Sequence, residues 1–526
     1  MTARRNFCVC CGLLEVNPKL STPYSRVFIL QLCAQVRVIK GNMIASSSRH
    51  STRYLKRLPL ALVIFLAIAW VGCGGGSSSS AVQTGPGNGG GGGGGGAAAT
   101  PATFFGMHVN HLADNPPWPN VPVAGLRMWD DETSWAQTNT GPGAYDWSNL
   151  DFWVGTALSN KADILYDLAR TPGWAQCSNS DVNCGSGDTS VTCFYATIAN
   201  EGGPGECFPP ADLHIDGTGS NQHWIDWVSA VATRYKGKIK YYEIWNEPSI
   251  STSWQGTTAQ LVRMAQDAQC VVQGKNCNAL SNYSGGKSID TSAVMLTPAF
   301  VTTDQADLVT LFTTYFQAGG GTYADNIAFH GYVGANPPEN VASLAGNLMA
   351  SVTASQGGKP LFDTEGSWGV HTAITDPDEQ VAFLSRYVLI QASLGVQRFY
   401  WYSWDADPVN LWSQASGTTP AGHAYAEMNT WIGPDSSGKG ATFSQACAAQ
   451  GSVWTCNLTR SGSYQAQAVW DASQTCSNGN CPTSSYTAPS QFTQYLDAAG
   501  NSTAINSGAT VQIGAKPILL ETGNIP

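Results

Sequence analysis

The chain has 526 residues, of which 43% are apolar and only 12% charged, and its 36 acidic residues outnumber the 26 basic ones. Ten of the basic residues but a single acid, Glu15, lie before position 58, so the rest of the chain carries a large excess of negative charge. This charge argues against binding to nucleic acid, because phosphate contacts require lysines and arginines. The 18 tryptophans and the many uncharged polar side chains favour neutral ligands with apolar faces, such as sugars.

Residues 1 to 73 have the layout of an export signal. Basic residues precede an apolar run from Leu58 to Gly72 that ends at Cys73. The run is shorter than the roughly 20 residues that a helix needs to span a bilayer. The segment Ala69–Cys73, followed by glycine and serine, resembles a bacterial lipoprotein cleavage site. The resemblance implies lipidation of Cys73 and a membrane anchor, with ordinary signal cleavage as the alternative.

A second methionine, Met43, would begin a signal of ordinary length, which leaves open whether residues 1 to 42 are translated. Residues 74 to 100 are nearly all glycine, serine and alanine, and they cannot bury enough apolar area to offset the entropy of ordering. We therefore expect a flexible linker there. The protein is expected to be exported, as a membrane-anchored lipoprotein or in the periplasm or outside the cell, and to be a monomer.

Ten cysteines follow Cys73, in an even number and at short local spacings. In an exported chain this pattern predicts loop staples, with five disulfides at most. A metal site is the alternative, but neither a C-x-x-C pair nor H-E-x-x-H occurs in this part of the chain. We expect no cofactor and no metal. The cysteines are 177, 184, 193, 207, 270, 277, 447, 456, 476 and 481.

From Pro101 to about Trp431, short β-branched runs alternate with longer amphipathic stretches, as in repeated βα units. Eight parallel strands with crossover helices predict a (β/α)₈ barrel over residues 101–432, with an open doubly wound sheet as the alternative. The expected strands are 103–109, 124–130, 162–168, 239–245, 294–299, 326–332, 360–365 and 396–402. The expected helices include 221–236, 257–273, 303–318, 340–355 and 376–394.

Two further regions flank this pattern. Residues 171 to 220 form a long insertion after the third strand, with four cysteines and many glycines and prolines, and we expect a stapled loop at the barrel mouth. Residues 433–526 alternate in the manner of strands and hairpins and predict a small antiparallel β-sandwich. Structural support is the favoured role for this domain, with a carbohydrate-binding module as the alternative.

Carboxylates follow two of the predicted strands. Active sites of such barrels lie at the C-terminal ends of the strands. The fourth strand ends in Asn246-Glu247-Pro248, and Pro248 forces the chain out of the sheet because it cannot donate to the ladder. The seventh strand ends in Glu365-Gly366, where the glycine permits a tight exit. Both glutamates are therefore expected at the same mouth.

This combination resembles clan A of the glycoside hydrolases over residues 101–432, and the appended β domain is similar to that of family 39. The resemblance implies hydrolysis of O-glycosidic bonds in polysaccharides or oligosaccharides by double displacement, with retention. It implies that Glu247 is the acid/base and Glu365 the nucleophile. It also implies that Asn246 holds the 2-hydroxyl of the sugar.

The resemblance assigns roles to residues at other strand ends. His330-Gly331-Tyr332 is similar to the H-x-Y of family 5, in which the tyrosine hydrogen-bonds the nucleophile. Arg127 matches a basic residue that steadies the charge of the nucleophile. Trp401 or Trp404 matches the aromatic floor of the sugar subsite.

Three other residues are weighed on their position alone. His108, on the first strand, is as much a core candidate as a substrate-binding one. Trp174 begins the stapled loop and is a candidate wall of a subsite. Glu243 is expected to pair with Lys240 or Arg398 and is given no catalytic role.

Glycoside cleavage needs a proton donor and an anion, so we expect Glu247 to be protonated and Glu365 ionised at rest. Repulsion between the two carboxyls, with Arg127 and Tyr332 beside one of them, would separate their pKa values. The rival interpretation is a catalytically inactive surface carbohydrate-binding protein on the same barrel. A serine hydrolase is disfavoured because no G-x-S-x-G occurs.

Overall fold

The computed structural model describes residues 99–112, 118–178, 180–185, 191–195, 203, 205–277, 288–370 and 374–526. The chain divides into two units, Met1–Gly91 and Gly92–Pro526, and all described residues belong to the second. The predicted leader, Cys73 and all but the last two residues of the predicted linker lie outside the described residues. Those two are held by the folded part, since Ala99 bridges Thr442 and Thr100 N donates to Ala441 O at 2.8 Å.

A closed parallel sheet forms the centre of the fold, and the predicted barrel is confirmed. Its strand order is β7-β6-β5-β2-β1-β11-β10-β9-β8, and β7 and β8 are successive parts of one chain passage. Isolated bridges from Asn246 to Ala299 and from Leu296 to Asn326 join this passage to both of its neighbours. All the strands but β8 lie inside a predicted range or overlap one, and β8 directly follows the predicted range 294–299. The strands are β1 (Phe105–Met107), β2 (Gly125–Met128), β5 (Asp163–Leu168), β6 (Tyr241–Ile244), β7 (Val294–Leu296), β8 (Phe300–Val301), β9 (Ile327–His330), β10 (Leu361–Gly366) and β11 (Arg398–Trp401).

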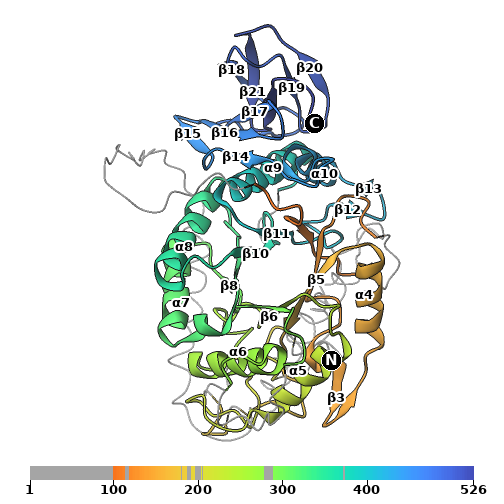
Figure 1. Ribbon diagram of the computed structural model, residues 1–526, viewed down its shortest axis with the longest axis vertical. Helices are drawn as coiled ribbons and strands as arrows, with labels where there is room; N and C mark the ends of the chain where they lie inside the picture. Colours follow the sequence, from red (N-terminus) through yellow and green to blue (C-terminus); the bar gives the residue numbers. More distant parts are fainter. Residues whose placement is uncertain are drawn as a thin grey trace, which may run out of the picture. The chain divides into compact units, whose positions relative to one another are not determined.

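Helices surround the strands, as Figure 1 shows. They start and stop where the sequence provides caps. Thr257, Asp304, Asp376 and Thr419 accept backbone N–H groups at helix N-termini. Glycines in the left-handed region end α6, α8 and α9. The helices are α3 (Trp135–Thr138), α4 (Ser148–Ser159), α5 (Gln222–Arg234), α6 (Thr258–Gln273), α7 (Gln305–Gln317), α8 (Asn340–Gln356), α9 (Pro377–Leu394) and α10 (Pro420–Ile432), with the 3₁₀ turn η2 (Gly320–Tyr323). Short hairpins add β3 (Asn139–Gly141) with β4 (Ala144–Tyr145), and β12 (Trp412–Ser413) with β13 (Gly417–Thr418).

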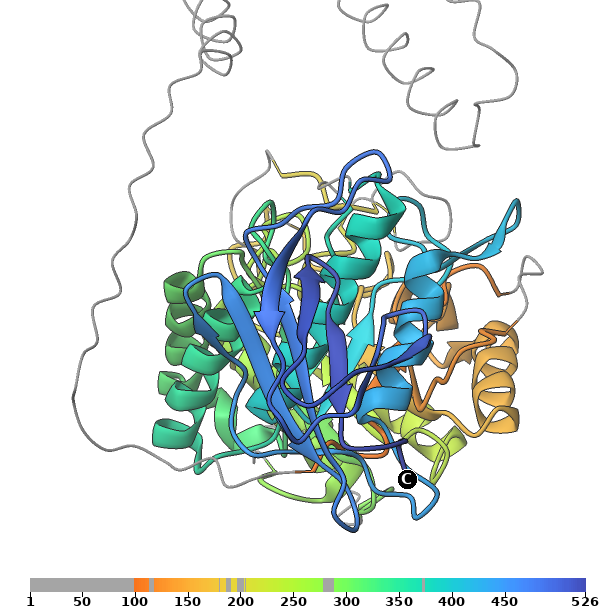
Figure 2. The same ribbon diagram turned by 90° about the horizontal axis from the view of Figure 1, so that it is seen from above.

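The C-terminal part is antiparallel, as predicted, and its strands are drawn in blue in Figure 2. One sheet has the order β14-β16-β17-β22-β19-β20 with β15 paired to β16, and β18 pairs with β21 beside it. Val469, Phe492, Val511, Ile513 and Leu520 form its buried core. The strands are β14 (Thr442–Phe443), β15 (Ala448–Gln450), β16 (Val453–Thr459), β17 (Gln465–Asp471), β18 (Thr483–Thr487), β19 (Gln494–Leu496), β20 (Ser502–Ala504), β21 (Thr510–Gly514) and β22 (Ile518–Glu521).

Polar contacts fasten this β domain to the last two barrel helices. The guanidinium of Arg460, between β16 and β17, donates to the carbonyls of Thr430, Trp431 and Gly433 at the C-terminus of α10. A cation there satisfies carbonyls that the helix itself leaves unpaired. Lys516 Nζ lies 2.8 Å from Asp378 Oδ1 at the start of α9. These contacts join the β domain to α9 and α10.

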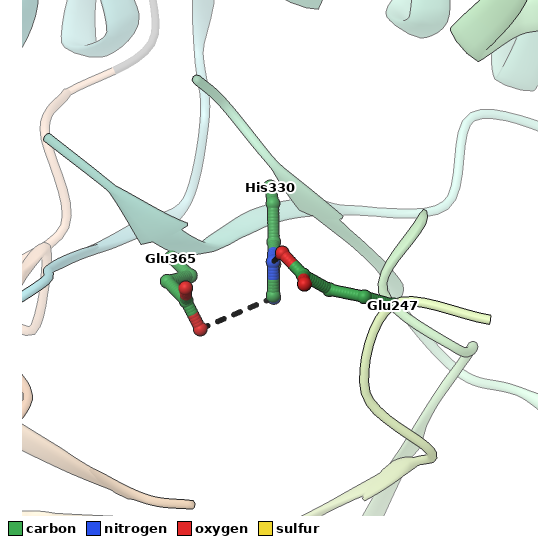
Figure 3. Close-up of side chains that lie close together, drawn as sticks. All are labelled: Glu247, His330 and Glu365. Carbon is green, nitrogen blue, oxygen red and sulfur yellow. Dashed lines mark hydrogen bonds and ion pairs between the residues drawn. The ribbon is translucent and has the colours of Figure 1, made fainter. Parts of the chain in front are cut away.

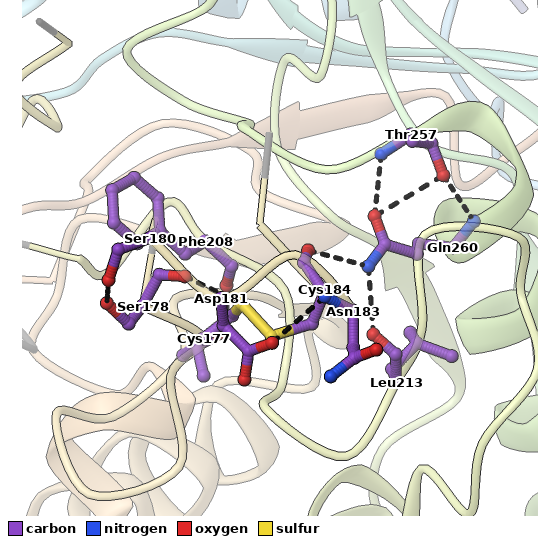
Figure 4. The surroundings of a disulfide bond; sticks show 11 residues. Cys177, Ser178, Ser180, Asp181, Asn183, Cys184, Phe208, Leu213, Thr257 and Gln260 are labelled. Carbon is purple, nitrogen blue, oxygen red and sulfur yellow. Dashed lines mark hydrogen bonds between the residues drawn. A yellow bond between two sulfur atoms is a disulfide. The ribbon is translucent and has the colours of Figure 1, made fainter. Parts of the chain in front are cut away.

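Five disulfides join the ten predicted cysteines in consecutive pairs, so the disulfide interpretation is confirmed. Figure 4 shows Cys177–Cys184 in the loop after β5, where Gln260 of α6 donates to the carbonyls of Cys184 and Leu213. The bonds are typical of an oxidising compartment. Within the described part of the chain, no helix has the length and apolar character of a membrane span.

Candidate active site

The barrel interior changes from apolar to polar toward the C-terminal ends of its strands. Leu165, Tyr241, Ala328 and Tyr400 belong to one buried cluster inside the barrel. Side chains two positions apart on a strand share a face, so the next inward positions lie at the mouth. Those positions carry polar groups on all four strands, namely Asp167, Glu243, His330 and Tyr402.

Glu365 lies at an irregular point of the sheet. The register between β9 and β10 shifts between Asp363 and Glu365, and Glu365 is paired with His330. Gly331 directly follows β9, and its N–H donates to Asp363 Oδ1 at 2.9 Å. A Cβ at Gly331 would lie 2.4 Å from Asp363 Oδ2 and from Tyr387 Oη. Only glycine fits between His330 and Tyr332 without displacing these groups.

Glu247 lies just past β6 in a backbone conformation that non-glycine residues rarely adopt. Its φ is 49° and that of Trp245 is 62°, both in the left-handed region. Trp245 is held there by its indole, which donates to Ser253 O at 2.8 Å. In the turn that follows, Ile250 N–H donates to Glu247 O at 2.9 Å. Such conformations persist where the surrounding structure determines them, and they are common at functional sites.

The two glutamates meet across His330, as Figure 3 shows. His330 Nδ1 lies 2.8 Å from Glu247 Oε1, and its Nε2 lies 3.7 Å from Glu365 Oε2. One carboxylate oxygen of each glutamate and a ring nitrogen of His330 all lie within 4.8 Å of one another. The side chain of Glu247 is 18% exposed and that of Glu365 is 9% exposed. Two carboxyl groups therefore face one partly open space.

Arg127 connects Glu365 to a second set of acids. Its Nη1 lies 2.9 Å from Glu365 Oε2, and its Nη2 lies 3.0 Å from Asp167 Oδ2. The guanidinium also donates to Glu243 Oε1, with Nε at 3.1 Å, and to Asn246 Oδ1 at 2.8 Å. Burial lowers the pKa of Arg127, but Glu243, Asp167 and Glu365 together raise it above its usual value. The arginine is therefore a permanent cation beside Glu365.

Glu243 pairs differently from the sequence expectation. Lys240 and Arg398, the expected partners, both contact Asp163 at the other end of the barrel strands. Two polar atoms of the cluster, Glu243 Oε2 and Asp167 Oδ1, have no hydrogen-bond partner among the described residues. Burial and the adjacent Glu243 raise the pKa of Asp167 well above its usual value.

Burial raises the pKa of both facing glutamates to about 7. Their direct contacts are unequal, because Glu365 accepts Tyr332 Oη–H at 2.8 Å as well as Arg127. Donors and cations stabilise the ionised form of a carboxyl group. These two contacts favour the ionised form of Glu365 over that of Glu247.

The two histidines of the site are neutral. Burial lowers the pKa of His330 to about 4 and that of His108 well below its usual value. His108 Nε2 donates to Thr364 O at 2.9 Å, so its proton is on Nε2. A neutral His330 can accept a hydrogen bond from protonated Glu247 at Nδ1 while its Nε2–H faces Glu365.

The set Glu247, His330 and Glu365 is also the arrangement through which a metal ion could be held. One imidazole and two carboxylates are ordinary ligands of divalent cations. The guanidinium of Arg127, 2.9 Å from a carboxylate oxygen of Glu365, opposes a second cation at the same oxygen. The charge around the set therefore favours a proton over a metal ion.

Several residues predicted to bind substrate occupy other places. Trp401 and Trp404 are fully buried, and Trp401 Nε1 donates to Val409 O at 3.0 Å, so neither ring presents a face to the site. Trp174 packs on β3 and α5, where its Nε1 donates to Asn139 O at 2.9 Å and its ring meets His223 edge-on. His108 is buried beside the site, and its ring meets that of Tyr402 edge-on at 5.1 Å.

Three residues near the pair were not predicted from the sequence, namely Asp130, Tyr195 and Tyr402. Asp130 accepts hydrogen bonds from Tyr195 Oη and Tyr402 Oη, both at 2.6 Å. Tyr402 comes two positions past the inward residue Tyr400 of its strand, a spacing that could have identified it. Asp130 lies three positions past Arg127, the inward residue of β2 that pairs with Leu165, so the alternation of that strand does not point to it. Tyr195 lies in the stapled loop, where periodicity gives no signal.

The sequence matches no family model and no curated protein. Among solved structures, the chain is similar to the GH39 enzyme from Xanthomonas axonopodis pv. citri, with a TM-score of 0.50 and 15% identity over 81% of this chain and 95% of that one. It is also similar to a glucosidase from Croceicoccus marinus, with a TM-score of 0.49 and 14% identity over 81% of this chain and 96% of that one. At these identities the likeness concerns the fold alone, a barrel with an appended β domain.

Proposed function

We propose that the protein is a retaining glycoside hydrolase in which Glu247 is the acid/base and Glu365 the nucleophile. The observation that carries the proposal is the approach of carboxylate oxygens of the two glutamates to within 4.8 Å at the mouth of the barrel. Carboxyl groups about 5 to 5.5 Å apart allow direct attack, whereas about 6.5 to 9.5 Å leaves room for the water of an inverting enzyme. The short separation favours the first arrangement.

The chemistry follows from the contacts of the pair. The Glu365 carboxylate attacks the anomeric carbon while Glu247 gives its proton to the departing glycosidic oxygen, which leaves a covalent glycosyl ester on Glu365. Glu247, now a carboxylate, removes a proton from water as that water attacks the same carbon. The ester bond to Glu365 breaks, and the original protonation states return.

The neighbours of the pair have positioning roles in this scheme. Arg127 and Tyr332 hold the Glu365 carboxylate in place and stabilise its charge between turnovers. His330 fixes the Glu247 carboxyl through Nδ1. Asn246 touches Arg127 through its Oδ1, which leaves its amide N–H groups for a substrate hydroxyl. The similar Xanthomonas protein is named a GH39 enzyme, which agrees with the proposal.

The proposal is tested by turnover of a panel of 4-nitrophenyl glycosides and polysaccharides. Each of the substitutions Glu365→Gln and Glu247→Gln is expected to lower turnover of unactivated substrates by roughly 10³-fold or more, which corresponds to an increase in the activation barrier of about 4 kcal/mol. Glu427→Gln is the matched control, because Glu427 contacts Trp431 on α10 and should retain full activity. Unchanged turnover by the Glu365→Gln variant would disprove the mechanism. Glycan binding without any hydrolysis by the parent protein would favour a sugar-binding barrel instead.

A further inference from the structure

Beside the glutamate pair, a carboxylate and three hydrogen-bonding side chains from different segments form one edge of the mouth. We call Asp130, Tyr402, Tyr195 and Asn110 the Asp130 edge. Asp130, Tyr402 and Asn110 follow β2, β11 and β1, and Tyr195 lies in the stapled loop. Tyr195 Oη donates to Asp130 Oδ1 and Tyr402 Oη to Oδ2, while Asn110 Nδ2 donates to Tyr402 Oη at 3.3 Å.

The Asp130 edge lies next to the proposed catalytic pair. The ring of Tyr402 meets that of His108, whose Nε2 is bonded to the carbonyl of Thr364, the residue before Glu365. After burial, which has the largest effect, the charge of Asp130 is among the causes that raise the pKa of both Glu247 and Glu365. A sugar ring seated on the pair would therefore have Asp130 within reach of its hydroxyls.

Asp130 is suited to accept a hydroxyl group. Its side chain is 14% exposed. A carboxylate offers about four lone-pair positions, and hydrogen bonds to it are roughly twice as strong as neutral ones. Oδ1 accepts Tyr195 and Arg170, whereas Oδ2 accepts Tyr402. Oδ2 thus retains capacity for one more donor.

The arginines near the site are engaged by the protein. The guanidinium of Arg170 lies over the rings of Trp129 and Tyr195, 4.2 Å and 3.5 Å from their centroids, and its Nη2 donates to Asp130. Arg127 is surrounded by Glu365, Asp167, Glu243 and Asn246. A carboxylate on the sugar would therefore face the carboxylates of Asp130 and Glu365, and like charges brought together in this way cost several kcal/mol.

We infer that the Asp130 edge is the hydroxyl-binding wall of the glycone subsite, and that it selects neutral sugars and rejects uronic acids. The inference rests on the proposed function for the identity of the reacting centre. Its own content is the chemical class of the sugar. Asp130 is a specificity-determining residue that hydrogen-bonds the substrate, and Tyr195 and Tyr402 position its carboxylate.

The test compares the best neutral aryl glycoside of the panel with the matching aryl uronide, the glucuronide for a glucoside or xyloside and the galacturonide for a galactoside. The parent protein should show kcat/KM at least about 100-fold higher for the neutral substrate. Asp130→Asn should lower kcat/KM for the neutral substrate by roughly 10- to 100-fold and narrow the preference at least tenfold, because the wall keeps its shape but loses its charge. Asp131→Asn is the matched control, since the side chain of Asp131 accepts Thr133 Oγ1–H, and its preference should equal that of the parent.

Two outcomes would overturn the inference: hydrolysis of the uronide as fast as the neutral glycoside by the parent, or an unchanged preference in Asp130→Asn. Calorimetric titration of the Glu365→Gln variant with the methyl glycoside and the methyl uronide gives the same comparison without turnover. If no substrate is hydrolysed but the neutral glycoside binds more tightly than the uronide, the proposed reaction fails and the neutral subsite stands. If the uronide binds as tightly as the neutral glycoside, the inference about the subsite is wrong whether or not the proposed reaction is right.

Discussion

Glu247 and Glu365 are chemically identical side chains whose surroundings differ. Both are buried, and burial raises the pKa of each to about 7. Burial therefore does not distinguish the acid/base from the nucleophile. The separation comes from Arg127 and Tyr332, which contact only Glu365 of the two. The pair therefore shares one proton around neutral pH and releases its two protons in steps that belong to the pair.

This sharing predicts a bell-shaped pH dependence of kcat/KM with its maximum near neutral pH. Activity rises as Glu365 ionises and falls as Glu247 loses the proton that the leaving group needs. Replacing Glu247→Gln should abolish the falling limb and keep the rising one, measured with a 2,4-dinitrophenyl glycoside whose leaving group needs no protonation. A falling limb that persisted in this variant would assign it to another group.

At the scale of single residues, the sequence was sufficient for the two glutamates and insufficient for their surroundings. Pro248 and Gly366 mark the strand exits, and parallel strands bring those exits to one mouth. Asp130 depends on Tyr195 and Arg170, which lie 65 and 40 residues away in the chain. Such long-range contacts leave no periodic signal in the sequence. The burial of Trp401 left none either.

Among the elements, the exit of β9 depends on one close approach. Gly331 separates His330 from Tyr332 and lies where a Cβ would meet Asp363 Oδ2 and Tyr387 Oη at 2.4 Å. The sequence shows the H-G-Y pattern, but the reason for its glycine is the packing of α9 against β10. The pairing of the cysteines was likewise undetermined by spacing, since even four cysteines allow three connectivities.

Replacing Gly331→Ala should therefore destabilise the fold by about 1 to 3 kcal/mol, because the added methyl overpacks a buried polar contact. Gly346→Ala on α8 is the matched control. Its Cβ would find only Leu394 at 4.0 Å, and a helical alanine in place of glycine should stabilise by about 0.5 to 1 kcal/mol. Urea unfolding measures the free energy of unfolding of both variants, which should decrease for Gly331→Ala and increase for Gly346→Ala. A Gly331→Ala variant as stable as the parent would contradict the packing argument.

Across the whole molecule, the strand and helix pattern was predictable because the periods of 2 and 3.6 residues differ and caps mark the helix ends. The closed order of the sheet followed from the number of strands. The buried acids were less predictable, because a carboxyl such as Asp363 looks like any strand residue in the sequence. Its side chain is enclosed by Gly331, Tyr387 and Gln391.

These buried acids predict that stability falls as pH rises from 6.5 to 8. Burial raises the pKa of Asp363 to about 8 and that of Asp131, Glu247 and Glu365 to about 7, so the folded state holds protons that the unfolded state has already lost. The buried histidines act in the opposite sense, but only up to their unfolded pKa near 6.5. Unfolding free energies at pH 6.5 and 8 and constant ionic strength should show the fall. A double Glu247→Gln, Glu365→Gln variant should show a smaller one, and stability that rises across this range would contradict the account.

The configuration of the first sugar released distinguishes a retaining enzyme from an inverting one. Proton NMR during the first minutes of hydrolysis, with mutarotation followed separately, identifies the anomer before it equilibrates. We expect the same anomeric configuration as in the substrate, because Glu365 and then water attack the same carbon in turn. Release of the opposite anomer would mean that water attacks directly, and Glu365 would not be the nucleophile.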